Sequence, residues 1–182
     1  MERYLITYCA PTLAALKPAS LFCYPLGERK DLDEQLARWV PRLDQRGLAL
    51  VVLRRDEDRA LLYLCHRRLL QAELNRPDSA AFLRRYGYDT TGLVPALERL
   101  RQRIQEAEGF PHEIGVFLGY PLEDVVGFIE NRGQNCKVTG YWKVYGDEDR
   151  ARALFARFRK CHEVYARLWR LGRPVERMIV AA

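Results

Sequence analysis

The order of hydrophobic and polar positions predicts strands and helices in alternation. Two continuous apolar runs, 48–53 and 60–65, flank the charged stretch 56–58, and this arrangement predicts a β-hairpin. Neither run alternates with polar residues, so we expect other elements to cover both faces of the hairpin. The hairpin is therefore predicted to lie in the middle of a sheet. Further strands are predicted at 20–24, 113–118 and 136–145.

Apolar positions at helical spacing predict the layers that cover this sheet. Asp31 and Glu34 have the spacing of a capping box, which predicts a helix start at Asp31. Pro41 lies inside that helix, so we expect a kink or a break there. Pro11 and Thr12 predict the start of a short helix that runs to Lys17. The helix that begins at Asp31 has the inward positions Leu32, Leu36, Val40 and Leu43, and further helices are predicted at 67–74, 78–86, from 90 or 91 onward, at 122–130 and from Asp147.

These elements predict an α/β fold (α+β mixed) in a single domain, residues 1–182. We expect one central mixed sheet of about four to five strands, including the hairpin, covered by about six helices. No apolar run reaches the roughly 20 residues that span a bilayer, so no membrane partner is expected. The first residues lack the features of a signal peptide, and we expect a cytoplasmic protein. The pattern leaves the oligomeric state open.

Composition narrows the class of protein further. Hydrophobic residues make up 48% and charged residues 30% of the chain, as in packed globular proteins. The five cysteines are widely spaced without a C-x-x-C pair, so reduced thiols are expected. The net charge of +6 raises the question of nucleic acid. Acidic residues are interleaved with the arginines almost throughout, which disfavours a nucleic-acid role without excluding it.

Three segments resemble one known family. They are Cys9–Phe22 near the start, Phe110–Val125, and Gly140–Gly146 followed by a helix that contains Lys160 and Cys161. Together they make the chain similar to the bacterial domain-of-unknown-function family 3793, found largely in anaerobes, over essentially its full length. The resemblance implies a small stand-alone cytoplasmic protein with no established activity. It supplies no catalytic residues.

The segment from 110 to 146 concentrates the glycine, aromatic and ionisable residues that could form a ligand site. The loop Gly119–Pro121 is predicted to follow a strand and precede a helix, which is where open α/β sheets bind ligands. It lacks the glycine series of a phosphate loop. Glu123 and Asp124 in the first turn of the next helix would repel an anion, so a cationic or neutral polar ligand fits better, although helix capping is the simpler role for these carboxylates.

On the predicted last strand, Tyr141, Lys143 and Tyr145 share one face that could stack on a flat ligand. A half-exposed edge strand protected by lysines explains the same pattern equally well. Two glycines, Gly115 and Gly119, would let a ligand or a packed helix approach the preceding strand, and we favour packing.

His112 and Glu113 do not form a metalloprotease motif, because position 116 is Val. We favour a hydrogen-bonded structural pair, and keep both residues as candidate ligand-binding positions. Cys9 precedes the predicted helix start, where the helix dipole would lower its pKa, whereas burial would make it inert. We favour burial.

A metal or haem site is the second hypothesis. Cys161 and His162 are adjacent on the last helix, and the dipeptide Cys65–His66 repeats at the end of a strand. These residues, with Cys9, His112 and Cys136, would hold a soft metal only if they converge in space, and a core histidine is the simpler role of His162.

The function expected first is therefore small-molecule binding near the Gly119–Pro121 loop. The alternatives are a metal- or haem-handling accessory protein and a nucleic-acid or protein interaction module. No motif defines a reaction class, a catalytic residue or a cofactor, and whether the protein is an enzyme stays open.

Overall fold

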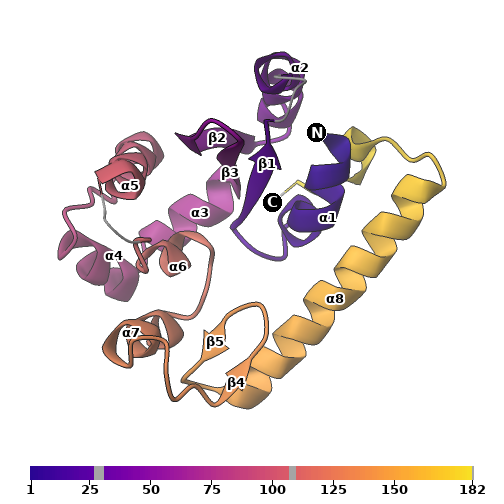
Figure 1. Ribbon diagram of the computed structural model, residues 1–182. Coiled ribbons are helices and arrows are strands. Elements are labelled where there is room, and N and C mark those ends of the chain that lie inside the picture. Colours follow the sequence, from indigo (N-terminus) through magenta and orange to yellow (C-terminus); the bar gives the residue numbers. More distant parts are fainter. Residues whose placement is uncertain (27–30, 107–109, 182) are drawn as a thin grey trace.

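A three-stranded antiparallel sheet between helices forms the centre of the computed structural model of the protein, which describes residues 1–26, 31–106 and 110–181 (Figure 1). The strands are β1 (Ala19–Pro25), β2 (Leu48–Arg55) and β3 (Arg59–His66). Their order is β1-β3-β2, so β3 is the central strand and β2 lies at an edge. The predicted hairpin is confirmed as β2 and β3, but only one of its strands is central. The sheet is smaller than expected and antiparallel rather than mixed.

Helices cover both faces of the sheet, as the lack of alternation in the hairpin predicted. Along β3, Leu62 and Leu64 face one hydrophobic core, while Tyr63 and Cys65 face the other. The first core is shared with α1 (Glu2–Leu13), α2 (Leu32–Asp44), the end of α8 (Glu148–Arg170) and the 3-10 helix η1 (Val175–Met178). The second is shared with α3 (Arg67–Leu74), α4 (Pro77–Arg84), α5 (Leu93–Glu106), α6 (Ile114–Phe117) and α7 (Leu122–Glu130).

The predicted strand at 113–118 is wrong, because this segment forms the short helix α6. All four residues of α6 are buried, so no polar position reveals the helical period. A short apolar run of this kind cannot be distinguished from a buried strand by periodicity. α6 ends at a turn in which Gly119 has φ of +74° and the Tyr120 amide donates to the Gly115 carbonyl at 2.9 Å, as is common at helix C-termini.

The predicted strand at 136–145 is also wrong, because a turn divides it into β4 (Val138–Thr139) and β5 (Lys143–Val144). The two pair antiparallel as a separate two-stranded sheet. Gly140 forms the turn, and its amide donates to the Trp142 carbonyl at 3.0 Å. A Cβ at position 140 would lie 2.2 Å from the Phe155 ring, so only glycine allows the hairpin to approach α8 this closely.

The first helix differs from its expected boundaries, whereas the second begins after Asp31 as predicted and differs only at its proline. α1 begins at Glu2 and contains Pro11, whereas the pattern predicted a helix start at that proline. α2 likewise continues through Pro41 to Asp44. The predicted inward positions Leu32 and Leu43 are confirmed as buried, but Trp39, which is 1% exposed, takes the place of Val40, which is 38% exposed.

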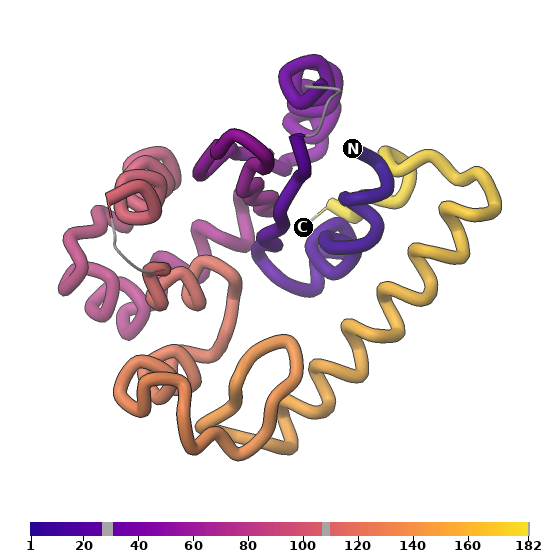
Figure 2. Tube along the Cα trace, viewed as in Figure 1, coloured from indigo at the N-terminus to yellow at the C-terminus, as the bar shows by residue number. Residues whose placement is uncertain are grey.

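The long helix α8 connects two parts of the molecule. Its first half packs on the β4–β5 hairpin through Phe155 and Phe158, and its second half packs along α1 (Figure 2). The C-terminal segment then returns to α1, where the Val180 amide donates to the Leu13 carbonyl at 2.8 Å. None of the helices described is long and apolar enough to span a membrane.

Candidate functional site

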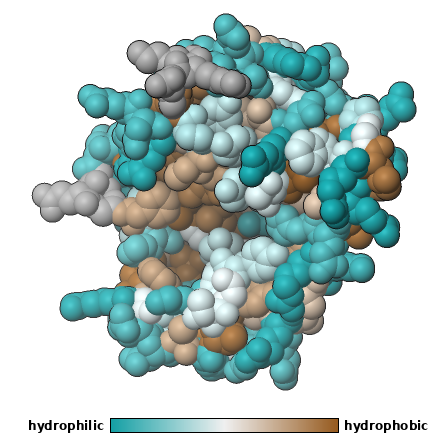
Figure 3. Space-filling view, turned by 45° about the vertical axis from the view of Figure 1, so that its right-hand side comes forward, coloured by the Kyte–Doolittle hydropathy of each residue, from teal (hydrophilic) through white to brown (hydrophobic). Residues whose placement is uncertain are grey.

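A pocket of about 330 Å³ lies between α6, α7 and the β4–β5 hairpin. Its walls are mostly apolar, and they are completed by the aromatic rings of Phe128, Tyr120 and Trp142. The pocket is at the lower end of the size range of small-molecule sites. On the face drawn in Figure 3, apolar side chains gather in a central recess that hydrophilic ones surround. The residues that line the pocket are Phe110, His112, Ile114, Gly115, Leu118, Tyr120, Asp124, Val125, Phe128, Thr139, Gly140, Trp142 and Lys143.

Tyr120 and Trp142 form one aromatic wall of this pocket. Their ring centroids lie 4.8 Å apart with an interplanar angle of 26°. On another side of Tyr120 lies the Lys17 ammonium, 5.5 Å from the centroid of the phenol ring. Burial raises the pKa of the Tyr120 phenol, so the hydroxyl remains neutral and can donate a hydrogen bond at neutral pH.

Asp124 holds the hairpin against α7. Its carboxylate is 2% exposed and accepts hydrogen bonds from the Trp142 indole at 2.7 Å and from the amides of Tyr145 and Gly146 at 2.7 and 2.8 Å. Three donors therefore balance the charge of a carboxylate that reaches the pocket wall. The residue supports Trp142 rather than capping α7, and it has little capacity left for a ligand.

His112 and Lys143 provide the basic groups of the pocket. The exposed His112 imidazole contacts the Phe128 ring edge-on, with centroids 4.9 Å apart. The Lys143 ammonium donates to the Gly133 carbonyl at 2.6 Å and lies 5.9 Å from the centroid of the same Phe128 ring. An ammonium group has three donors, and among the described residues Lys143 uses one of them.

Gly115 and Gly119 serve packing rather than ligand approach. A Cβ on Gly115 would lie 2.7 Å from a methyl group of Val125, which is how α7 approaches α6. Gly119 has φ of +74°, and a Cβ there would lie 2.3 Å from the Pro18 ring. The loop 119–121 therefore follows a helix and is fixed against the start of β1, so the expected position at the end of a strand is wrong.

Glu113 lies next to His112 in sequence but not in the pocket. It is 2% exposed and accepts from the Arg103 guanidinium at 2.8 Å and from the Tyr88 hydroxyl at 3.1 Å. Burial and the neighbouring carboxylate raise the pKa of Tyr88, which keeps its hydroxyl protonated as the donor. Glu113 thus connects α5 to α6 and is not available to a ligand.

Tyr141 and Tyr145 do not share a site with Lys143, because Lys143 lines the pocket and neither tyrosine does. Tyr145 donates its hydroxyl to the Gln134 carbonyl at 2.9 Å on the surface. Tyr141 lines a separate hollow between α1 and α8, where its ring lies parallel to His162 with centroids 6.1 Å apart.

Cys9 lies within α1 and is fully buried, so its predicted position ahead of a helix start is wrong. Burial raises the pKa of its thiol to about 12, which makes it inert at neutral pH. Lys17 lies nearby, and burial lowers the pKa of this ammonium to about 8.

The candidate metal ligands do not converge. His66 is 3% exposed at the end of β3, and burial lowers the pKa of its imidazole. His162 and Cys161 lie on α8, and burial also lowers the pKa of His162. Within residues 1–26, 31–106 and 110–181, no group of three or more His, Cys, Asp or Glu residues could hold a metal ion.

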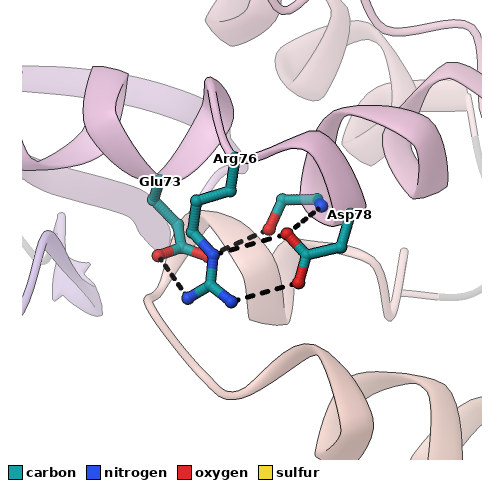
Figure 4. Close-up of polar contacts among 4 residues, drawn as sticks. Glu73, Arg76 and Asp78 are labelled. Atoms are coloured by element: carbon teal, nitrogen blue, oxygen red, sulfur yellow. Dashed lines mark hydrogen bonds and ion pairs between the residues drawn. The ribbon is translucent and has the colours of Figure 1, made fainter.

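The 119–121 loop also borders a larger, more polar groove of about 750 Å³. Figure 4 shows one side of it, where Arg76 lies between Glu73 and Asp78 at the junction of α3 and α4. The Arg76 guanidinium is 3.1 Å from the Asp78 carboxylate and 3.6 Å from that of Glu73. The guanidinium thus offsets one of the two negative charges, and Arg76 and Asp78 lie at the exposed surface.

Sequence reasoning found four residues of the pocket, namely His112, Tyr120, Asp124 and Lys143. It missed Phe128 and Trp142, which provide two of its walls. Phe128 follows Val125 by three positions, so the helical spacing of α7 contained the signal. Trp142 was assigned to the face opposite Lys143, yet both residues line the pocket.

The fold and the site together define a small mixed α/β protein with an apolar pocket beside its sheet. Residues 5–179 match the family described as Protein of unknown function (DUF3793), and the chain belongs to this family. Comparison with curated proteins and with solved structures gave no match.

Proposed function

We propose that the protein binds a small molecule in the pocket between α6, α7 and the β4–β5 hairpin. One observation carries this proposal: a mostly apolar pocket of about 330 Å³ has two basic side chains, His112 and Lys143, among its lining residues. Apolar walls with a few convergent polar groups are the usual composition of ligand sites.

The lining favours a flat, largely apolar ligand that carries one carboxylate or carbonyl group. Tyr120, Trp142 and Phe128 offer ring faces and edges for stacking. The Lys143 ammonium uses one of its three donors within residues 1–26, 31–106 and 110–181, and the others can reach an acceptor on the ligand. Asp124 does not oppose an anion here, because three N–H groups already bind its carboxylate.

The proposal is tested with 2-naphthoate, its methyl ester and 2-naphthylmethylamine as probes of shape and charge. Binding is followed by the indole N–H resonances in ¹H–¹⁵N spectra. Trp142 lines the pocket, whereas Trp39 is 1% exposed in the core between α1, α2 and the sheet. A shift of the Trp142 signal alone therefore reports binding in the pocket, and a shift of both signals reports a change of the whole fold. We expect naphthoate to shift the Trp142 signal most strongly and the amine least.

Two variants locate the binding. Lys143→Gln should weaken naphthoate about tenfold, as loss of one charge-assisted hydrogen bond predicts. Lys137→Gln is the matched control, because Lys137 donates to the Gly146 carbonyl at 2.6 Å on the same hairpin and does not line the pocket. Thr139→Trp should fill the pocket mouth from an exposed position and abolish binding. Binding that Thr139→Trp leaves unchanged, or no Trp142 shift with any probe, would contradict the proposal.

A further inference from the structure

Positive charge is concentrated in one segment, although acidic residues are interleaved with the arginines over most of the chain. Residues 157–173 contain six Arg or Lys residues and one Glu, so they carry five of the six net positive charges of the protein. Most of this segment is the second half of α8, which runs along one side of the molecule beside α1 (Figure 1). A local excess of this size is the electrostatic footprint of a polyanion site.

These charges border a hollow of about 490 Å³ between α1 and α8, here called the α1–α8 groove. On its α8 side the groove extends from Arg159 to Arg170. Eleven helical positions separate these residues, which corresponds to about 16 Å along the helix axis. The groove is therefore long enough for an extended ligand that meets both guanidinium groups at once.

The arginines of the groove are not neutralised by the part of the chain that the structure describes. Arg159 and Arg170 are exposed, and neither forms an ion pair with another described residue. Glu163 is the one acidic residue in the lining, and it lies 3.7 Å from the Lys160 ammonium. Arg167 is exposed one row further out on α8, three positions from Arg170. This side of α8 therefore presents cationic groups to a ligand.

Aromatic rings lie between these charges. Trp169 and Tyr141 line the groove, and both are partly exposed. Phe158 contacts the Tyr141 ring edge-on at a centroid distance of 5.3 Å, and the His162 ring lies parallel to it with an interplanar angle of 8°. Burial raises the pKa of Tyr141 and lowers that of His162, so both rings are uncharged at neutral pH. Aromatic rings beside cationic side chains are the composition of sites for unpaired bases.

We propose that the α1–α8 groove binds single-stranded nucleic acid, with bases stacked on Trp169 and Tyr141 and phosphates bound by Arg159 and Arg170. An acidic peptide would satisfy the arginines but would leave the rings without a stacking partner, whereas every base has a π-face. In a duplex the bases already stack on one another, so the rings would not reach them. The groove shares no lining residue with the pocket between α6, α7 and the β4–β5 hairpin, so this site stands independently of the proposed function.

Fluorescence anisotropy with a fluorescein-labelled oligothymidylate of about 12 nucleotides tests the proposal. We expect a dissociation constant on the order of 10 µM at about 50 mM salt. Three phosphate contacts would release enough counterions to weaken binding roughly 20-fold when the salt is raised to about 200 mM.

A pair of double variants locates the phosphate contacts. Arg159→Gln/Arg170→Gln should weaken binding at least about tenfold at low salt and should make it less dependent on salt, because two contacts are lost. Arg84→Gln/Arg157→Gln is the matched control. It removes the same charge from two exposed residues that do not line the groove, and it should weaken binding less than about threefold.

Tryptophan emission measures the stacking separately. The unlabelled oligonucleotide should quench the emission of Trp169, since Trp39 is 1% exposed and Trp142 lies in the other pocket. Trp169→Leu should abolish the quenching and weaken binding about tenfold, with the salt dependence of wild type. Trp169→Phe should abolish the quenching but stay within about threefold of the wild-type affinity, and this variant decides the matter if the leucine does not fold.

Three outcomes overturn the proposal. The first is no binding at low salt, and the second is binding that the two double variants weaken equally. The third is an affinity for polyglutamate, or for a duplex of the same length, that equals the affinity for the single strand and leaves the Trp169 emission unchanged.

Discussion

The central sheet and the pocket region are stabilised by different interactions. Each strand of the sheet has apolar neighbours on both faces, and Leu62 and Leu64 of β3 are fully buried among them. The β4–β5 hairpin has only two residues in each strand and is held instead by Asp124, whose carboxylate accepts three hydrogen bonds. The sheet depends on buried apolar area, whereas the hairpin depends on one polar residue.

This difference shows where the protein can form a ligand site. An apolar core packs to high density and leaves little space. The hairpin is held at a distance from α6 by Asp124 and by the close approach of Gly140 to Phe155, and the pocket lies in the space between. The region with fewer apolar contacts is therefore the one that we expect to open most readily.

The largest effect should come from the sheet. Leu62→Ala removes a fully buried side chain of the central strand and should lower the free energy of unfolding by about 4 kcal/mol. Urea denaturation measures the change. A loss of less than about 1 kcal/mol would mean that the sheet does not depend on its apolar core as described.

Asp124→Ala should have the next largest effect, a loss of about 3 kcal/mol, because it leaves the Trp142 indole and two backbone amides without an acceptor. Hydrogen exchange should accelerate in residues 138–146 while the strands of the sheet keep their protection. Asp147→Ala is the control, since it removes only the cap bond to the Arg150 amide at the start of α8 and should cost about 1 kcal/mol. Uniform acceleration across the whole chain would contradict a local role.

Lys17 connects the two regions, since its ammonium approaches Tyr120 and Phe158 from the loop between α1 and β1. Its pKa of about 8 in the folded protein lies below the ordinary 10.5, so the charged amine destabilises the fold below pH 8. That cost disappears as the pH rises toward 10.5. Lys17→Met should therefore stabilise the protein by about 1–2 kcal/mol at pH 7.

The pH dependence of this stabilisation distinguishes its cause. The difference between Lys17→Met and wild type should be constant below pH 8 and should shrink at pH 10, where the unfolded amine also begins to lose its proton. Denaturation at pH 7 and pH 10 gives both values. A difference that does not change with pH would mean that packing of the methionine, rather than removal of charge, is responsible.

The smallest effect is expected at the exposed cluster around Arg76. Hydrogen bonds from Arg76 and from the Ser79 amide lower the pKa of the Asp78 carboxylate, but both charged groups are exposed and screened. Arg76→Gln should shift the melting temperature by less than about 2 °C, and the shift should vanish at high salt. A larger shift would indicate that the junction of α3 and α4 contributes to the packing below it.

The sequence predicted the elements in which apolar residues recur at strand or helix spacing over the whole length of the element. The β2–β3 hairpin was correct because two apolar runs of strand length flank a charged turn, and α5 and α8 were correct because their apolar stripes continue over several turns. It failed at 113–118, where a four-residue helix is buried on every side and shows no period. It failed at 136–145, where Gly140 forms a turn that the apolar pattern does not reveal.

The candidate site was predicted only in part, because residue type was visible in the sequence and tertiary contacts were not. Tyr120 and Lys143 were identified as residue types that bind ligands, and both line the pocket. Glu113 was identified on the same grounds, yet Arg103 and Tyr88 occupy its carboxylate. A sequence shows which groups could bind, but it does not show which of them the protein already uses internally.

The amino-acid sequence alone determined the mixed α/β class, the hairpin, the family resemblance and the absence of any recognisable catalytic motif, because each depends on residue type and local spacing. Tertiary structure decided which groups meet: Trp142 lies beside Tyr120, and the Asp124 carboxylate holds the β4–β5 hairpin. These positions follow from packing between segments far apart in the chain, and a local pattern contains no information about such distances.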